Sequence, residues 1–106
     1  MSDKVYMLNA LWFKEDGGAE KYAEYVQAAT PFVREVGGKV VLQGLVPEVG
    51  IIGEWDPDLV FVVEYPSWEA FLELPEHPGY QKISHLRDEA LENSLLIRCR
   101  HQGALV

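Results

Sequence analysis

Two histidines, a tyrosine and an arginine lie close together in the stretch HPGYQKISHLR, residues 77–87. An arginine can bind an anion, and an imidazole or a phenol can exchange a proton with a bound molecule. A helix that begins near the proline of this stretch would place Tyr80 and Arg87 on one side, whereas His85 would lie well round the helix and His77 would precede it. The spacing therefore allows either a ligand site or the ordinary polar surface of a helix.

Arg87 and Tyr80 each have two interpretations. The aliphatic stem of Arg87 can cover core surface with its head in water, or its guanidinium can be a fixed cation for an anionic ligand. Tyr80 can fill the core or offer its hydroxyl to a pocket. A metal site is not expected, because His77 and His85 do not have the one-turn spacing with which a helix presents two ligands to a metal.

The sequence contains no motif for several other kinds of chemistry. It has no GxSxG elbow, no CxxC pair, no phosphate-binding GxxxxGK[ST] loop and no GxGxxG after a strand. No catalytic residue can be assigned on this basis, and His85 and Tyr80 are the candidates. His77 and Glu64 are further candidates for general acid–base work.

Charge and cysteine content limit the partners and the compartment. The chain has 17 acidic and nine basic residues, and its net charge of −8 repels phosphate backbones and anionic lipid surfaces. We therefore expect no nucleic-acid or membrane partner. Cys99 is the only cysteine, and the sequence has neither a signal-peptide pattern nor a long apolar span. We expect one cytoplasmic domain, residues 1–106.

Sheet-like and helix-like patterns alternate along the chain in the order βαββαβ. The predicted strands are residues 4–13, 39–46, 59–65 and 95–101. One predicted helix carries an apolar stripe from Tyr22 to Val36, and two further helical segments cover residues 68–74 and about 78–93. This order predicts an α+β, ferredoxin-like fold, a four-stranded antiparallel sheet with both helices on one face.

Local signals mark the predicted helix ends. Pro31 is expected to kink the first helix or to split it, with Thr30 capping a short second piece. Gly37 and Gly38 should end that helix with a left-handed C-cap, and Ser67 should cap the start of the next one.

The side chains of each strand alternate between two sets, one for each face of the sheet. The set assigned to the helices is Tyr6, Leu8, Ala10, Trp12, Val40, Leu42, Phe61, Val63, Tyr65, Leu95, Ile97 and Cys99. The second set is Val5, Met7, Asn9, Leu11, Phe13, Val41, Gln43, Leu45, Val60, Val62, Glu64, Leu96, Arg98 and Arg100. Two helices cover only one face, and each large apolar side chain left in water would forfeit roughly 1.5–3 kcal/mol. We therefore expect a homodimer through this second sheet face, which would form a dimeric α/β barrel.

Four side chains of the second set are polar: Asn9, Gln43, Glu64 and Arg98. Buried polar groups need partners. These residues can form hydrogen bonds and an ion pair across the dimer, or they can line a cavity and contact a ligand.

Several stretches of the chain resemble the family called domain of unknown function 1330. They are YAEY (22–25), GGK (37–39), GEWDP (53–57), EYPSWEAF (64–71) and HPGYQKISHLR (77–87), within a resemblance that covers about residues 5–100. It implies the dimeric α/β-barrel version of the ferredoxin-like fold. The wider superfamily includes cofactor-free monooxygenases, isomerases and haem-handling enzymes, so the resemblance implies no single reaction.

The resemblance extends to individual positions. Tyr80 and Arg87 match a recurrent tyrosine and arginine of the family, and Trp55 and Pro57 match its turn. His77 stands where a small residue is more usual. His85 is the nearest candidate for the histidine that haem-using relatives place on the second long helix, although we expect no cofactor.

The leading hypothesis is a homodimer that binds a small organic molecule in a pocket between sheet and helices. If it is an enzyme, it is a cofactor-free one of monooxygenase or isomerase type. The candidate ligand-binding residues are Arg87, Tyr80, Trp12 and Asn9, with Arg87 as the anion clamp and Tyr80 or His85 as the proton donor. The alternative is a non-catalytic dimerisation or regulatory module with no small-molecule site. An enclosed, partly apolar cavity containing Tyr80 and Arg87 would favour the first hypothesis.

Overall fold

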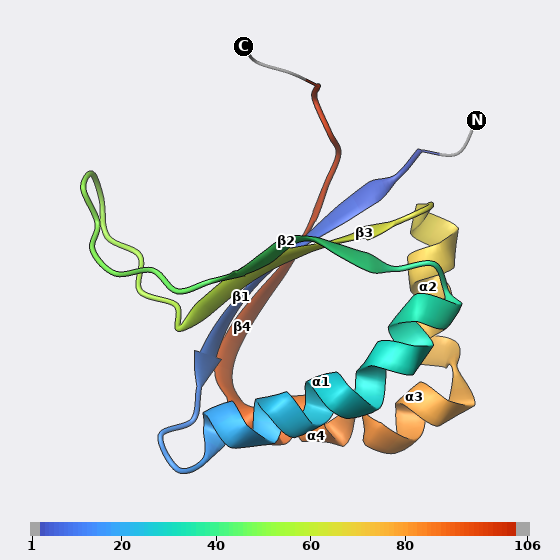
Figure 1. The fold of residues 1–106 in the computed structure, drawn as a ribbon, viewed down its shortest axis with the longest axis horizontal. Coiled ribbons are helices and arrows are strands. Elements are labelled where there is room, and N and C mark those ends of the chain that lie inside the picture. The colour runs from blue at the N-terminus through green and yellow to red at the C-terminus, as the bar shows by residue number, and fades with distance from the viewer. Residues whose placement is uncertain (1–2, 104–106) are drawn as a thin grey trace.

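The fold is a single sheet with all of its helices on one side (Figure 1). The computed structural model describes residues 3–103. Its elements are β1 (Val5–Phe13), α1 (Gly18–Glu35), β2 (Lys39–Leu45), β3 (Leu59–Tyr65), α2 (Trp68–Glu76), α3 (Pro78–Ile83), α4 (His85–Ala90) and β4 (Leu91–Cys99). The four strands pair antiparallel in the order β2-β3-β1-β4. The predicted α+β, ferredoxin-like architecture is confirmed.

Helix α1 forms because its apolar residues recur at helical spacing and bury Tyr22, Tyr25 and Ala29 on one side. Of the two alternatives predicted at Pro31, a kink or a split, the split is wrong, since α1 runs through this proline as one helix. Thr30 does not cap a second piece; its hydroxyl donates to the Val26 carbonyl oxygen at 2.6 Å, inside the helix. Figure 1 shows α1 curving along its length.

The turn after α1 and the start of α2 follow the predicted signals. Gly37 has a φ of 88°, and its backbone N–H donates to the Arg34 carbonyl oxygen, so the left-handed end of α1 is confirmed. The Ser67 hydroxyl accepts a hydrogen bond from the Ala70 N–H at 3.0 Å, as an N-cap does.

The last helical segment is shorter than predicted. It divides at Ser84 into α3 and α4, and the helical structure ends at Ala90 rather than near Asn93. Strand β4 instead begins at Leu91, because the end of β1 pairs with residues 91–93: Trp12 with Asn93, and Phe13 with Leu91. Pairing with a neighbouring strand outweighs the local helical pattern here.

The assignment of faces was correct for β3 and wrong for β1 and β4. In β2 it was correct for Val40, which pairs with Val63, and wrong for Leu42, which pairs with Val62 on the uncovered face. Phe61, Val63 and Tyr65 of β3 face the helices as predicted. The strand register places Val5, Met7, Asn9 and Leu11 of β1, with Leu96 and Arg98 of β4, on the same helix-covered side. The uncovered face therefore carries Tyr6, Leu8, Ala10, Trp12, Leu95, Ile97 and Cys99. Both sets of β1 are apolar, so alternation alone does not say which set the helices cover.

The core consists of two clusters on the helix-covered side. One contains Leu11, Tyr22, Tyr25, Ala29, Ala90 and Leu91, where α1 and α4 pack at one end of the sheet. The other contains Val5, Met7, Val63 and Tyr65, beneath α2 at the opposite end. No helix within residues 3–103 has the length and apolar character needed to cross a bilayer.

Candidate functional site

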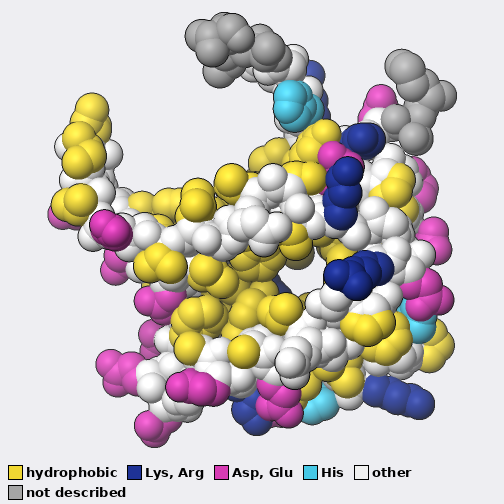
Figure 2. Space-filling view, viewed as in Figure 1, with side chains coloured by type: hydrophobic (Ala, Val, Ile, Leu, Met, Phe, Trp, Pro, Cys, Tyr) yellow, Lys and Arg dark blue, Asp and Glu magenta, His cyan; other side chains and the backbone are white. Residues whose placement is uncertain are grey.

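A cavity of about 680 Å³ lies between the sheet and the helices, bordered by both core clusters. Figure 2 shows the molecule hollowed at this place, with hydrophobic side chains on the walls and Lys or Arg side chains at one edge. Strands β1 and β3 form the floor with Met7, Asn9, Phe61, Val63 and Tyr65. The volume is in the range of pockets that hold small organic molecules, roughly 300–1,000 Å³.

Arg87 of α4 lines this cavity. Its Nη2 atom is buried and has no hydrogen-bond partner within residues 3–103. Its backbone N–H donates to the Ser84 carbonyl oxygen at 3.1 Å, which fixes the start of α4. A buried guanidinium donor without an acceptor is costly, and an anion in the cavity would remove that cost. The interpretation of Arg87 as a stem with its head in water does not fit a buried Nη2.

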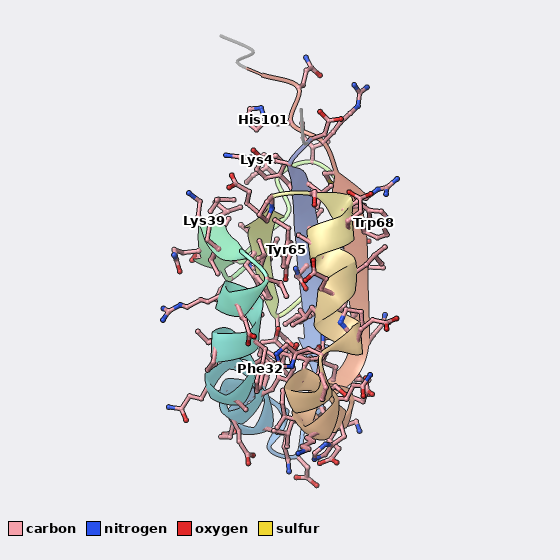
Figure 3. The ribbon with its side chains drawn as sticks, turned by 90° about the vertical axis from the view of Figure 1, so that its right-hand side faces the viewer. Lys4, Phe32, Lys39, Tyr65, Trp68 and His101 are labelled. Atoms are coloured by element: carbon pink, nitrogen blue, oxygen red, sulfur yellow. The ribbon has the colours of Figure 1, made fainter. Side chains whose placement is uncertain are left out.

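Four tyrosines surround the cavity: Tyr22, Tyr25, Tyr65 and Tyr80. The hydroxyls of Tyr25 and Tyr80 are 2.8 Å apart and share a hydrogen bond between α1 and α3. Figure 3 shows Tyr65 in the gap between α1 and α2. The tyrosines thus provide aromatic walls together with hydroxyl groups.

Burial raises the pKa of three of these phenols, those of Tyr22, Tyr25 and Tyr65. It raises the pKa of Tyr22 to about 12, although the Arg87 charge pulls the pKa back somewhat. It also raises the pKa of Tyr65 to about 12. Burial, followed by the hydrogen bond to Tyr80, raises the pKa of Tyr25 well above the usual value for a phenol. At neutral pH these groups are therefore neutral hydroxyls that can donate hydrogen bonds.

Three charged side chains line the cavity, and all are cations: Arg34, Lys39 and Arg87. Lys39 lies at the cavity edge, since its ammonium also reaches Glu64 of the uncovered face at 4.0 Å. Among the residues that the structure describes, no carboxylate, imidazole or thiol lines it. This is unusual for a chain with 17 acidic and nine basic residues. The local field therefore favours an anion, despite the net negative charge of the protein.

The other predicted site residues lie in different places. Asn9 lines the cavity, is buried, and donates from its Nδ2 to the Met7 carbonyl oxygen at 3.1 Å. Trp12 lies on the uncovered face of the sheet, where its Nε1 donates to Asp56 at 3.0 Å. His85, at the start of α4, is exposed and does not line the cavity. The structure therefore brings together Tyr80, Arg87 and Asn9, and leaves Trp12 and His85 apart from them.

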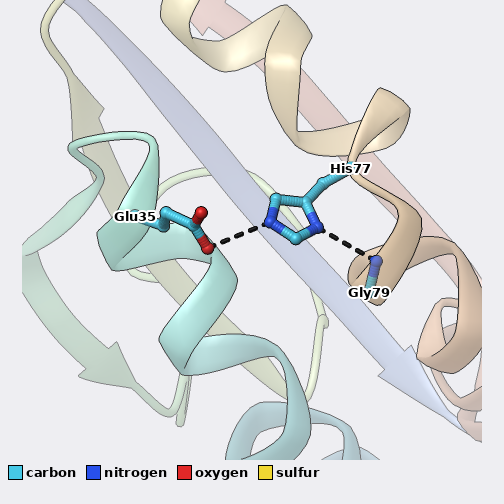
Figure 4. A network of polar contacts seen from close by, with 3 residues as sticks. All are labelled: Glu35, His77 and Gly79. Carbon is cyan, nitrogen blue, oxygen red and sulfur yellow. Dashed lines mark hydrogen bonds and ion pairs between the residues drawn. The ribbon is translucent and has the colours of Figure 1, made fainter.

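His77 joins α1 to α3 (Figure 4). Its Nδ1 accepts a hydrogen bond from the Gly79 N–H at 3.0 Å, so Nε2 carries the proton in the neutral ring and donates to Glu35, also at 3.0 Å. The ring packs against Phe32 with 4.8 Å between centroids. These contacts give His77 a structural place outside the cavity lining.

The four polar strand residues do not form one group. Gln43 lines the cavity with Asn9, whereas Glu64 lies on the uncovered face and pairs with Lys4 and Lys39 at 3.5 and 4.0 Å. Arg98 stacks over Trp68 at 4.5 Å from the ring centroid. Arg34 and Lys39 were not expected at the site. The sequence carries no signal for them, because they come from the end of α1 and from the bulged strand β2.

Within residues 3–103, no group of three or more His, Cys, Asp or Glu side chains is arranged to hold a metal ion. This finding concerns only the described residues.

The sheet, the one-sided helices and the cavity between them define a protein of the ferredoxin-like α+β class. The chain belongs to the family described as domain of unknown function (DUF1330), whose model matches residues 4–98. The predicted resemblance is confirmed. A search of curated proteins finds no match.

Solved structures agree with this assignment. A protein of unknown function from Rhodopseudomonas palustris is 33% identical, with a TM-score of 0.87 over 98% of this chain and 86% of that one. A dimeric ferredoxin-like protein of unknown function from a Jannaschia species has a TM-score of 0.74 at 14% identity, over 92% of this chain and 99% of that one. SnoaB, a cofactor-independent oxygenase from Streptomyces nogalater, has a TM-score of 0.68 at 17% identity, over 98% of each chain. The last two similarities concern the fold alone.

Proposed function

We propose that the protein binds a small organic anion with an apolar or aromatic body in the cavity between sheet and helices. The observation that carries this proposal is the buried, unpartnered Nη2 of Arg87 in the lining of a 680 Å³ cavity. The anionic group would accept hydrogen bonds from Arg87. The apolar body would lie against Phe61, Val63 and the tyrosine rings.

The cavity also favours this function over the alternative of a non-catalytic module. A dimerisation or regulatory module needs no space of this size between sheet and helices, and the cavity found here contains Tyr80 and Arg87 and is partly open to solvent. Catalysis without a cofactor has a precedent in this fold through SnoaB. We restrict the proposal to binding, because the described lining includes no carboxylate, imidazole or thiol that could take a proton.

The test is a calorimetric titration with small aromatic carboxylates, each compared with its neutral amide. We expect the carboxylate to bind and the amide to bind more weakly. Substituting Arg87→Gln should weaken carboxylate binding about 10- to 100-fold, the range for losing a charged hydrogen bond. Arg98→Gln is the matched control, since Arg98 stacks on Trp68 and does not line the cavity. Unchanged carboxylate binding by folded Arg87→Gln protein would remove the clamp role.

We also propose that the chain forms a homodimer through the uncovered face of the sheet. This face and the neighbouring loop carry exposed apolar side chains, including Leu42, Leu45, Leu95 and Ile97. Two of the structural neighbours are described as dimeric. Sedimentation velocity should give the mass of two chains at micromolar concentration, and a stable single-chain species would contradict the proposal.

A further inference from the structure

The connection between β2 and β3, residues 46–58, projects from the sheet on the side away from the helices (Figure 1). We call it the arm. Its tip is strongly apolar, because Ile51 and Ile52 are 87% and 96% exposed. Leaving two isoleucines almost wholly in water is unfavourable. The arm therefore carries side chains that another surface is expected to cover.

The base of the arm is fixed to β1 by three hydrogen bonds. Asp58 accepts from the Phe13 N–H at 2.8 Å and donates its own N–H to the Leu11 carbonyl oxygen at 2.7 Å. Asp56 accepts from the Trp12 indole at 3.0 Å. Trp55 also packs edge-on against Trp12, with 6.4 Å between ring centroids. The arm is thus anchored to β1 at its base, and its two isoleucines lie beyond this anchor.

The opposite end of the uncovered face contains a hollow of about 560 Å³. Its apolar wall includes Tyr6, Leu42 and Val62, and its rim includes Arg100 and His101. His101 packs on Tyr6 with 5.4 Å between ring centroids. The hollow is far from the arm of the same chain, because the arm joins the ends of β2 and β3 at Leu45 and Leu59, whereas Tyr6 pairs with Glu64 at the other end of β3.

The two ends of the sheet carry opposite charge. The arm contains Glu48, Glu54, Asp56 and Asp58 and no Lys or Arg. On the uncovered face, the end with the hollow holds three of the nine Lys and Arg residues: Lys4, Lys39 and Arg100. Figure 3 shows Lys4, Lys39 and His101 at this end. Glu64 also lines the hollow, where it contacts both lysines and offsets part of this charge.

We propose that the arm of each chain docks on the uncovered face of a second copy, with Ile51 and Ile52 in the hollow beside Arg100. A two-fold axis in the interface, perpendicular to the strands, places the acidic arm of one chain over the basic end of its partner. The same axis places the partner's arm over the basic end of the first chain. An axis along the strands would instead bring the two acidic arms together. The inference rests on the proposed homodimer and is independent of the ligand in the cavity.

The first test compares the double substitution Ile51→Ser and Ile52→Ser with the wild-type chain by sedimentation equilibrium. Removing four isoleucines from one dimer should raise the dimer dissociation constant at least about a hundredfold. Leu72→Ser is the matched control, since Leu72 is exposed on α2, on the helix side of the molecule. This control should leave the dissociation constant unchanged.

The second test fixes the orientation with disulfide crosslinks in a Cys99→Ser background. The pair Ile52→Cys with Gln102→Cys should give covalent dimers on oxidation, because Gln102 lines the hollow. Ile52→Cys alone should give none. A covalent dimer from Ile52→Cys alone would mean that the arms meet each other, and would overturn the inference.

The outcomes separate this inference from the proposed function. A wild-type monomer would remove the homodimer and the arm contact together. A wild-type dimer that is unaffected by the isoleucine substitutions would remove the arm contact alone, and the arm tip would then belong to a different partner. Neither result changes the anion-binding experiment on Arg87.

Discussion

In the cavity, the paired hydroxyls of Tyr25 and Tyr80 differ from the Nη2 atom of Arg87, because in the described part of the chain only the hydroxyls have a hydrogen-bond partner. The Tyr25 and Tyr80 hydroxyls satisfy each other across the gap between α1 and α3. Arg87, on the next helix, has a buried Nη2 with no acceptor within residues 3–103. The tyrosine pair therefore contributes to the fold whether or not a ligand is bound, whereas Arg87 gains an acceptor only when something enters. A substitution of Arg87 should therefore weaken ligand binding without weakening the fold, whereas a substitution of Tyr25 or Tyr80 should affect both.

His77 provides a test of a structural role at the scale of one residue. Replacing His77 by Ala removes the cap on Gly79 and the contact with Glu35, and should lower the free energy of unfolding by about 1–2 kcal/mol in urea titrations. His77→Asp retains an acceptor for the Gly79 N–H but places like charge beside Glu35. If His77→Ala left unfolding unchanged but abolished ligand binding, the role of His77 would be functional instead.

The site residues that could be predicted are those that share one segment of the chain. Tyr80 and Arg87 emerge from helical spacing within residues 77–87, and both line the cavity. The hydroxyl pairing of Tyr25 could not be predicted, because apolar spacing marks Tyr25 only as a core residue and its partner lies 55 positions away. The positions of Arg34 and Lys39 at the cavity depend on how α1 and β2 are placed relative to each other, and the local sequence pattern does not predict this placement.

At the scale of elements, the turn between α1 and β2 depends on one glycine. Gly37 has a φ of 88°, and a Cβ there would lie 2.7 Å from Pro66 Cγ. Gly37→Ala should therefore cost more than the roughly 1–2 kcal/mol of a left-handed residue, as measured by chemical denaturation. Gly17→Ala is the matched control, because Gly17 has a φ of 76° with nothing within 4 Å of its Cβ position. Equal losses for the two variants would show that the Pro66 contact yields without cost.

The elements themselves were largely predictable, and their faces were not. Strand 59–65 was predicted at its observed bounds, since a β-branched run between turn signals leaves little choice. In β1, both alternating sets of side chains are largely apolar, so either could face the helices: Val5, Met7 and Leu11, or Tyr6, Leu8 and Trp12. Only the packing of α1 and α2 decides between them. The start of β4 was missed for a similar reason. Residues 91–93 have a helical sequence pattern, but they pair with β1 as a strand.

At the scale of the whole molecule, the helices touch the sheet mainly at its two ends. The clusters around Leu11 and around Met7 border the cavity, whose floor includes Asn9. Helix α1 spans both clusters, since it supplies Tyr22 to one and Val33 to the other. A ligand that fills the cavity would add contacts in the middle of this span, and should stabilise the fold by RT ln(1 + L/Kd), where L is the free ligand concentration.

The tyrosines that surround the cavity make the stability of the whole molecule sensitive to alkaline pH. The pKa of Tyr22 rises from 10.0 to about 12 on folding, so the folded state holds its proton more tightly than the unfolded state. The resulting stability is fully present below pH 10 and is lost as the pH rises toward 12, at about 1.4 kcal/mol per pH unit for one such tyrosine. The pKa of Tyr65 shifts in the same direction for the same reason, burial. We therefore expect the urea midpoint of unfolding to fall steeply above pH 10.

Tyr22→Phe separates this effect from general alkaline repulsion in an acidic protein. The variant retains the aromatic ring in the cluster with Leu11 and Tyr25 but has no proton to lose. The stability of the wild-type chain relative to Tyr22→Phe should be constant between pH 7 and 9.5, and should then decline through pH 11.5. Absorbance of the phenolate at 295 nm should rise together with unfolding rather than before it. Parallel stability curves for the two proteins, or a phenolate signal from the Tyr22 position in the folded state near pH 10, would contradict the assigned burial of this hydroxyl.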